Sequence, residues 1–90
     1  MKKIYKYIIH EGECIPISLP ENSVFLRVDQ QNQQIVLWFI IDEINNLHTR
    51  SFSTFQTGKQ LPFDILDQKF LGSVQLYNGS YVSHVFEIIK

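Results

Sequence analysis

The stretch QQIVLWFIID, residues 33–42, carries an uninterrupted apolar run of seven residues from Ile35 to Ile41. A run of this length between polar residues is typical of a β-strand. Successive side chains of a strand point to opposite faces, so both faces of this strand are apolar. One face fits the core of a chain of 90 residues, and the sequence leaves open what covers the other face.

Alternating and β-branched patterns recur along the chain, and no long helical stripe interrupts them. We predict six strands, over residues 3–10, 23–29, 34–42, 48–56, 69–77 and 80–89. The Asn78-Gly79 pair is a strong hairpin signal because both residues tolerate positive φ angles. Residues 57–68 form a longer connection. The sequence therefore predicts a single all-β domain over residues 1–90, a small antiparallel six-stranded meander that forms a sandwich or a partly open barrel.

Turn positions predict which residues face each other in two hairpins. The turn at Asn78-Gly79 predicts the pairs Leu76 with Tyr81, Val74 with Ser83, and Gly72 with Val85. A loop over residues 30–33 predicts the pairs Val28 with Ile35, Leu26 with Leu37, and Val24 with Phe39. Both faces of each hairpin then carry large apolar side chains, which soluble monomers rarely expose together. We therefore expect a homo-oligomer, a dimer or a tetramer, in which a second copy covers the outer face. The alternative is that the 57–68 segment folds over it.

Composition and spacing exclude several classes of function. A net charge of -1 argues against DNA or RNA polymers as partners, because their binders carry clustered cations. No apolar run approaches the length of a membrane span, so we expect no membrane contact. His10 and Cys14 lie four residues apart, but a structural zinc site needs a second pair of ligands, so we expect no metal and no cofactor. The serines near His84 lack an orienting acid on the same strand face, which predicts a binding protein and not an enzyme.

The candidates for ligand contact are Arg27, Trp38, Arg50, Phe52, Thr57, Gly58, Lys59 and His84. In the turn at residues 57–59, a glycine beside a hydroxyl and an ammonium can bind a phosphate, although an ordinary turn has the same composition. Each arginine is predicted to share a face with an aromatic ring, a combination that stacks on bases or forks onto phosphates. The alternative is a guanidinium that lies over an apolar face. His84 can bond to a base or serve as a hydrogen-bonded structural residue.

Four segments carry a resemblance that spans nearly the whole chain: MKKIYKYII, IVLWFIID, RSFSTFQTGKQLP and GSVQLYNGSYVSHVFEI. They resemble a family of small phage proteins with a Lys-Ile-Tyr-Lys-Tyr start and a His-Val-Phe-Glu end. The chain departs from the family pattern at Gln56, where the family has the first glycine of Gly-Thr-Gly, and at Lys59, where it has histidine.

That family is similar to viral anti-CBASS sponge proteins, which sequester cyclic dinucleotide signals of bacterial anti-phage immunity. The resemblance implies a phage immune-evasion protein in the host cytoplasm, which binds a cyclic dinucleotide such as 3′3′-cGAMP at or near a homo-oligomer interface without cleaving it. Two alternatives stay open. One is a protein-binding inhibitor of a host defence enzyme, and the other is a structural accessory protein with no small-molecule ligand.

Overall fold

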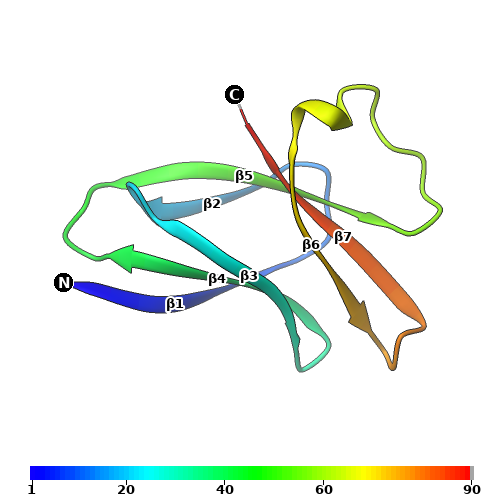
Figure 1. Ribbon diagram of the computed structural model, residues 1–90, viewed down its shortest axis with the longest axis horizontal. Coiled ribbons are helices and arrows are strands. Elements are labelled where there is room, and N and C mark those ends of the chain that lie inside the picture. Colours follow the sequence, from blue (N-terminus) through cyan, green and yellow to red (C-terminus); the bar gives the residue numbers. More distant parts are fainter. Residues whose placement is uncertain (90) are drawn as a thin grey trace.

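The computed structural model describes residues 1–89 and contains seven strands and one turn of 3-10 helix (Figure 1). The strands are β1 (Lys2–Ile9), β2 (Ile15–Pro20), β3 (Val24–Gln31), β4 (Gln34–Asp42), β5 (Leu47–Gln56), β6 (Lys69–Leu76) and β7 (Tyr81–Ile88), and the helical turn is η1 (Ile65–Asp67). The expectation of an all-β protein is confirmed. The predicted number of six strands is wrong, because β2 was missed.

The strands form two antiparallel sheets, a three-stranded sheet in the order β1-β4-β3 and a four-stranded sheet in the order β2-β5-β7-β6. The chain changes sheet after β1, after β2 and after β4, so the fold is a sandwich and not a simple meander (Figure 1). β3 and β6 lie beside each other across the two sheets. No closed barrel forms from residues 1–89.

β2 contains Pro16 and Pro20, which the sequence analysis treated as part of a connection. Proline lacks the N–H group that an internal strand needs, but an edge strand has one side without a partner. β2 is such an edge, because it pairs with β5 alone. Leu19 in this strand is fully buried and contributes to the core.

The core fills the space between the two sheets. β4 and β1 contribute one side of it, and β2, β5, β6 and β7 contribute the other. The fully buried Phe39 of β4 contacts Phe52 of β5 edge to face, with ring centroids 6.2 Å apart. The buried cluster consists of Ile9, Leu19, Ile35, Leu37, Phe39, Ile41, Phe52, Val74, Leu76 and Val85. One face of the apolar run at residues 35–41 therefore faces this core, as predicted.

The predicted register of the last hairpin is correct. Leu76 pairs with Tyr81, and the pairing continues along β6 and β7 to Gly72 and Val85. The turn between these strands contains three residues with positive φ, Tyr77, Asn78 and Gly79.

The predicted register of the β3–β4 hairpin is wrong. Its loop consists of two residues, Asn32 and Gln33, which both have positive φ, and Gln31 pairs with Gln34. Two hydrogen bonds hold Gln33 in this conformation. Its backbone N–H donates to the side-chain oxygen of Gln30, and its own side-chain oxygen accepts from the backbone N–H of Tyr77. A β-bulge at Leu26 then shifts the strand, so that Phe25 and not Leu26 faces the core.

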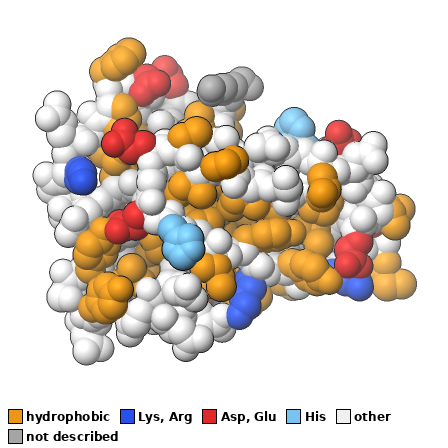
Figure 2. Space-filling view, turned by 180° about the vertical axis from the view of Figure 1, so that it is seen from behind, with side chains coloured by type: hydrophobic (Ala, Val, Ile, Leu, Met, Phe, Trp, Pro, Cys, Tyr) orange, Lys and Arg blue, Asp and Glu red, His pale blue; other side chains and the backbone are white. Residues whose placement is uncertain are grey.

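The outer face of the three-stranded sheet, called the open face below, is not covered by any other segment of residues 1–89. Its apolar side chains are Ile4, Ile8, Val24, Leu26, Val36, Trp38 and Ile40. Ile4 is 61% exposed and Val24 is 55% exposed. The alternative in which the 57–68 segment folds over this face is therefore wrong. Figure 2 shows the side of the molecule that faces away from the viewer in Figure 1, with hydrophobic side chains across its middle and most charged side chains toward its edges.

Candidate functional site

The outer face of the four-stranded sheet contains a pocket of about 260 Å³, called the phenylalanine pocket below. Its lining comes from the end of β5, the turn that follows it, and strands β6 and β7. The lining residues are Phe55, Gln56, Thr57, Gly58, Lys59, Leu61, Phe70, His84 and Phe86. Phe86 contacts Phe70 at a centroid distance of 5.3 Å and Phe55 at 6.0 Å, so three rings form one wall.

His84 is held in this pocket by two hydroxyl groups. Its Nε2 lies 2.7 Å from the Oγ1 of Thr57, and its Nδ1 lies 2.6 Å from the Oγ of Ser73. The sheet places these groups together, because Ser73 of β6 pairs with His84 of β7, and the Thr57 backbone N–H donates to Val82. A hydroxyl can donate or accept a hydrogen bond, so this arrangement fixes the ring in one orientation in either tautomer.

The turn beside His84 contains the predicted phosphate-binding residues. Gly58 has a φ of +86°, a conformation that favours glycine, and the N–H of Lys59 donates to Gln56. The side chain of Lys59 forms no ion pair with any of residues 1–89. An exposed ammonium beside a hydroxyl and an imidazole makes this end of the pocket suitable for an anion.

Two other predicted residues, Arg27 and Trp38, lie on the open face, on the other sheet. They line a hollow of about 280 Å³ together with Ile4, Leu26 and Asp29. Arg27 pairs with Asp29 at 3.3 Å, and both side chains are largely exposed. The expectation that Arg27 and Trp38 lie together is confirmed, but they do not join the residues of the phenylalanine pocket.

The remaining two predicted residues, Arg50 and Phe52, face the space between the sheets. Phe52 is fully buried in the core. Arg50 donates to both carboxylate oxygens of Glu87, at 2.6 and 2.8 Å, and to the backbone oxygen of Ser23 at 2.7 Å. Its guanidinium also lies 5.2 Å from the ring centroid of Phe39. These contacts give Arg50 a structural role, because they use three of its donors inside the fold.

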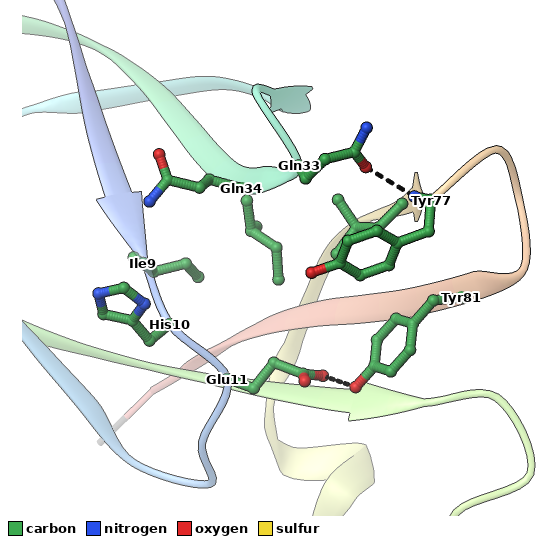
Figure 3. Close-up of a pocket in the computed structure, with 9 residues that line it drawn as sticks. Ile9, His10, Glu11, Gln33, Gln34, Tyr77 and Tyr81 are labelled. Atoms are coloured by element: carbon green, nitrogen blue, oxygen red, sulfur yellow. Dashed lines mark hydrogen bonds between the residues drawn. The ribbon is translucent and has the colours of Figure 1, made fainter.

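A second cavity, called the tyrosine mouth below, opens at one end of the sandwich between the sheets (Figure 3). Its volume is about 290 Å³, and it is lined by Ile9, His10, Glu11, Gln33, Gln34, Ile35, Leu76, Tyr77 and Tyr81. The rings of Tyr77 and Tyr81 meet edge to face with centroids 6.4 Å apart. Buried core residues form its floor, so the cavity combines an apolar base with a polar rim.

Glu11 and Tyr81 set the electrostatics of the tyrosine mouth. The phenol of Tyr81 donates a hydrogen bond to the Glu11 carboxylate (Figure 3). This bond raises the pKa of Tyr81 to about 12, because loss of the proton would place a phenolate against a carboxylate. The rim therefore presents a carboxylate acceptor, with only His10 as a basic side chain among the lining residues.

A third hollow of about 250 Å³ shares lining residues with both cavities. Glu11 and Tyr81 line both this hollow and the tyrosine mouth, while Phe55, Gln56 and Lys59 line both this hollow and the phenylalanine pocket. Glu13 adds a further carboxylate to it. The three hollows are therefore neighbours around one end of the four-stranded sheet and are together called the groove below.

The sequence analysis missed most of the aromatic lining of this groove. Simple alternation places Phe70 on the inner face, but a bulge at Leu71 makes Phe70 pair with Phe86 on the outer face. Glu11 and Tyr81 come from positions 70 residues apart, and no local pattern links them. A signal was available at Gly72, since a glycine inside a strand pattern often accompanies a bulge.

Residues 1–89 contain no group of three histidine, cysteine or acidic side chains arranged to hold a metal ion. The same residues include no helix that is long and apolar enough to cross a membrane.

Comparison with curated proteins and with solved structures finds no match for this chain. A family model does match, and it covers residues 1–90. The chain therefore belongs to the family described as a domain of unknown function, DUF7352.

Proposed function

We propose that this protein is a phage immune-evasion protein that sequesters a cyclic dinucleotide, such as 3′3′-cGAMP, in the host cytoplasm without cleaving it. It acts as a homo-oligomer, a dimer or a tetramer. One observation carries the proposal. The phenylalanine pocket joins Thr57, Gly58, Lys59 and His84, which the sequence marked separately as ligand contacts, to a wall of three aromatic rings.

The two ends of the phenylalanine pocket suit the two parts of a nucleotide. Phe70 is 55% exposed although it contacts Phe86, so its ring is accessible to a base. Stacking of a base on an aromatic side chain contributes about 1–3 kcal/mol. Lys59 and the Thr57 hydroxyl lie at the other end, where a phosphate would receive a charge-assisted hydrogen bond.

The groove favours a dinucleotide over a mononucleotide. Its two aromatic hollows, the phenylalanine pocket and the tyrosine mouth, can each take one base, and Lys59 lines the third hollow, which shares residues with both. The Glu11 carboxylate can accept hydrogen bonds from the N–H groups of a base in the tyrosine mouth. Glu13 in the third hollow opposes a phosphate there, so we expect the phosphates to lie on the Lys59 side.

The surroundings of His84 support binding without cleavage. In a catalytic triad, one ring nitrogen of the histidine bonds to the nucleophilic hydroxyl, and the other bonds to a carboxylate that orients and stabilises the protonated ring. Both ring nitrogens of His84 have hydroxyl partners, and no carboxylate among residues 1–89 forms a hydrogen bond with them. His84 therefore serves to orient Thr57 and Ser73 toward a ligand.

The test is calorimetric titration of the protein with 3′3′-cGAMP, cyclic di-GMP, cyclic di-AMP and the linear dinucleotide pGpA. We expect binding of at least one cyclic dinucleotide and recovery of the ligand intact after denaturation of the complex. Lys59→Ala should weaken the affinity about tenfold, a typical loss for a charge-assisted hydrogen bond. Lys2→Ala makes the same change in net charge on the other sheet and should leave the affinity unchanged. No binding to the whole panel, or recovery of a cleaved ligand, would overturn the proposal.

The second candidate is a protein-binding inhibitor of a host defence enzyme. The observation that favours it is the apolar open face, where Ile4 and Val24 are more than half exposed. A structural accessory protein would use the same surface. These candidates gain support if the chain binds no nucleotide of the panel and forms no oligomer.

A further inference from the structure

Residues 59–68 form an arm whose phenylalanine and one of whose leucines are almost fully exposed to solvent. Phe63 is 101% exposed and Leu66 is 93% exposed. The arm is held by its own backbone hydrogen bonds, from Ile65 to Pro62 and from Asp67 to Asp64, and Ser53 donates to the side chain of Gln68 at its base. A fixed segment that presents a phenylalanine and a leucine to solvent has the form of a docking element.

The open face contains a hollow of matching chemistry. It measures about 280 Å³, and its apolar lining consists of Ile4, Leu26 and Trp38. Ile4 and Leu26 are 61% and 43% exposed, so no segment of the described residues 1–89 fills it. The arm rises from the four-stranded sheet, between β5 and β6, whereas the hollow belongs to the three-stranded sheet.

The charges around the two surfaces are complementary. The arm carries Asp64 and Asp67, and its one lysine, Lys59, lies at the opposite end, next to β5. The open face carries Arg27 beside the hollow and Lys6 in the pair with Trp38 on the same face. Asp29 is the acidic residue that lines the hollow on the open face, and its carboxylate pairs with Arg27. An acidic apolar arm therefore suits this basic apolar face.

We propose that Phe63 of one copy inserts into the hollow formed by Ile4, Leu26 and Trp38 of a second copy, with Asp64 and Asp67 facing Lys6 and Arg27. This inference rests on the oligomer of the proposed function and names the surfaces that build it. The arm and the hollow are different surfaces, so the contact is heterologous, and its repetition closes into a ring or an exchanged dimer when the rotation between copies allows. Leu61 in the arm lines the phenylalanine pocket of its own chain, and the proposed docking contact does not use it.

The decisive experiment is native mass spectrometry of the full chain and of Phe63→Asp. We expect a closed multimer for the natural sequence and a monomer for Phe63→Asp, with the same melting temperature for the monomeric fold because the Phe63 side chain is fully exposed among residues 1–89. The matched control is Ile44→Asp, because Ile44 is 83% exposed in the turn between β4 and β5, outside the arm and the hollow. Ile44→Asp should keep the multimer.

Each outcome of this experiment is informative. A multimer that survives Phe63→Asp overturns the arm contact and leaves the oligomer of the proposed function standing. A natural sequence that is monomeric at all concentrations overturns both. Calorimetry of the Phe63→Asp monomer with 3′3′-cGAMP separates these results from the nucleotide proposal, because the groove is built within one chain.

A charge exchange tests the pairing of the two surfaces directly. Asp64→Arg/Asp67→Arg places cations on the arm, and Lys6→Glu/Arg27→Glu places acids on the open face. Each double variant alone brings like charges together and should be monomeric. An equal mixture restores opposite charges at every contact and should recover multimers that contain both variants. Separate monomers in the mixture would contradict the proposed pairing.

Discussion

The two outer faces of the sandwich are both apolar, but they differ in how their polar groups are arranged. On the open face of the three-stranded sheet, the charged side chains of Lys6, Arg27 and Asp29 lie beside aliphatic residues and Trp38. The ion pair between Arg27 and Asp29 is exposed to solvent. On the face of the four-stranded sheet, hydroxyl groups hold His84 on both sides beside three phenylalanine rings.

This difference separates a surface for a protein from a site for a small molecule. A ligand of a few rings needs polar groups fixed at defined positions, which the Thr57–His84–Ser73 arrangement supplies. A protein partner needs a broad apolar area with a charged margin, which the open face supplies. One chain of 90 residues thus offers two kinds of recognition on opposite sheets, and variants of each face should act on one property only.

The largest expected effect is a difference in the free energy of unfolding between substitutions of the two arginines. Arg50 lies between the sheets, and Arg27 lies on the open face. Arg50→Ala leaves the Glu87 carboxylate, which is 7% exposed as a residue, without its bidentate partner. Loss of one partner of a buried ion pair costs about 3–5 kcal/mol, so we expect a decrease near the lower value in the free energy of unfolding. Arg27→Ala, on an exposed pair, should change it by less than about 0.5 kcal/mol. Urea denaturation measures both.

Equal stabilities for the two arginine variants would show that the Arg50–Glu87 pair contributes nothing to the fold. The double variant Arg50→Met/Glu87→Leu provides the control. Since it removes both charges together, it should recover most of the loss that Arg50→Ala causes.

A smaller effect is expected from substitutions that each alter only one of the two outer faces. Phe70→Ala removes one stacking surface of the phenylalanine pocket and should weaken nucleotide binding by about 1–3 kcal/mol, while the native mass stays unchanged. Trp38→Asp and the gentler Ile4→Asp place a carboxylate in the hollow of the open face. They should abolish the multimer and leave the affinity per chain within about twofold. Calorimetry and native mass spectrometry on all three variants check both properties. Loss of both properties in a folded variant would contradict the separation of the two faces.

The sequence was sufficient for the parts of the fold that local chemistry determines. The Asn78-Gly79 turn predicted the register of β6 and β7 as far as Gly72 and Val85, and the run at residues 35–41 predicted the central strand of the three-stranded sheet. The register of β3 could not be predicted, because the side chain of Gln33 is held by a hydrogen bond to Tyr77 from a distant turn. Pro16 and Pro20 concealed β2, since their tolerance depends on the strand being an edge.

The candidate site was predictable as residue types but not as a location. Thr57, Gly58, Lys59 and His84 were marked by their chemistry, and only the pairing of β5, β6 and β7 brings them together. Arg50 shares its strand face with Phe52, so alternation alone indicated that Arg50 would point inward if Phe52 were core. What the sequence could not provide is Glu87 as its partner, because that contact spans 37 positions.

The smallest expected effect concerns the pKa of Tyr81, which lines the tyrosine mouth. Its phenol must be protonated to donate to Glu11, and the pKa of Tyr81 is raised from 10.0 to about 12 by that bond. The folded pKa therefore exceeds the unfolded value, and the stability that this bond contributes is fully present below pH 10 and is lost as the pH rises toward 12.

In Glu11→Gln, the carboxylate that opposes the phenolate is absent, so the pKa of Tyr81 should fall toward 10.0. Ultraviolet titration of phenolate formation measures the shift, with Tyr81→Phe identifying which transition belongs to this residue. Glu43→Gln serves as the matched control, since Glu43 bonds to Tyr5 on the other sheet and should leave the Tyr81 transition in place. If the natural sequence and Glu11→Gln titrate identically, the Tyr81–Glu11 bond does not persist in solution, and the carboxylate of the tyrosine mouth is free to turn away from a bound base.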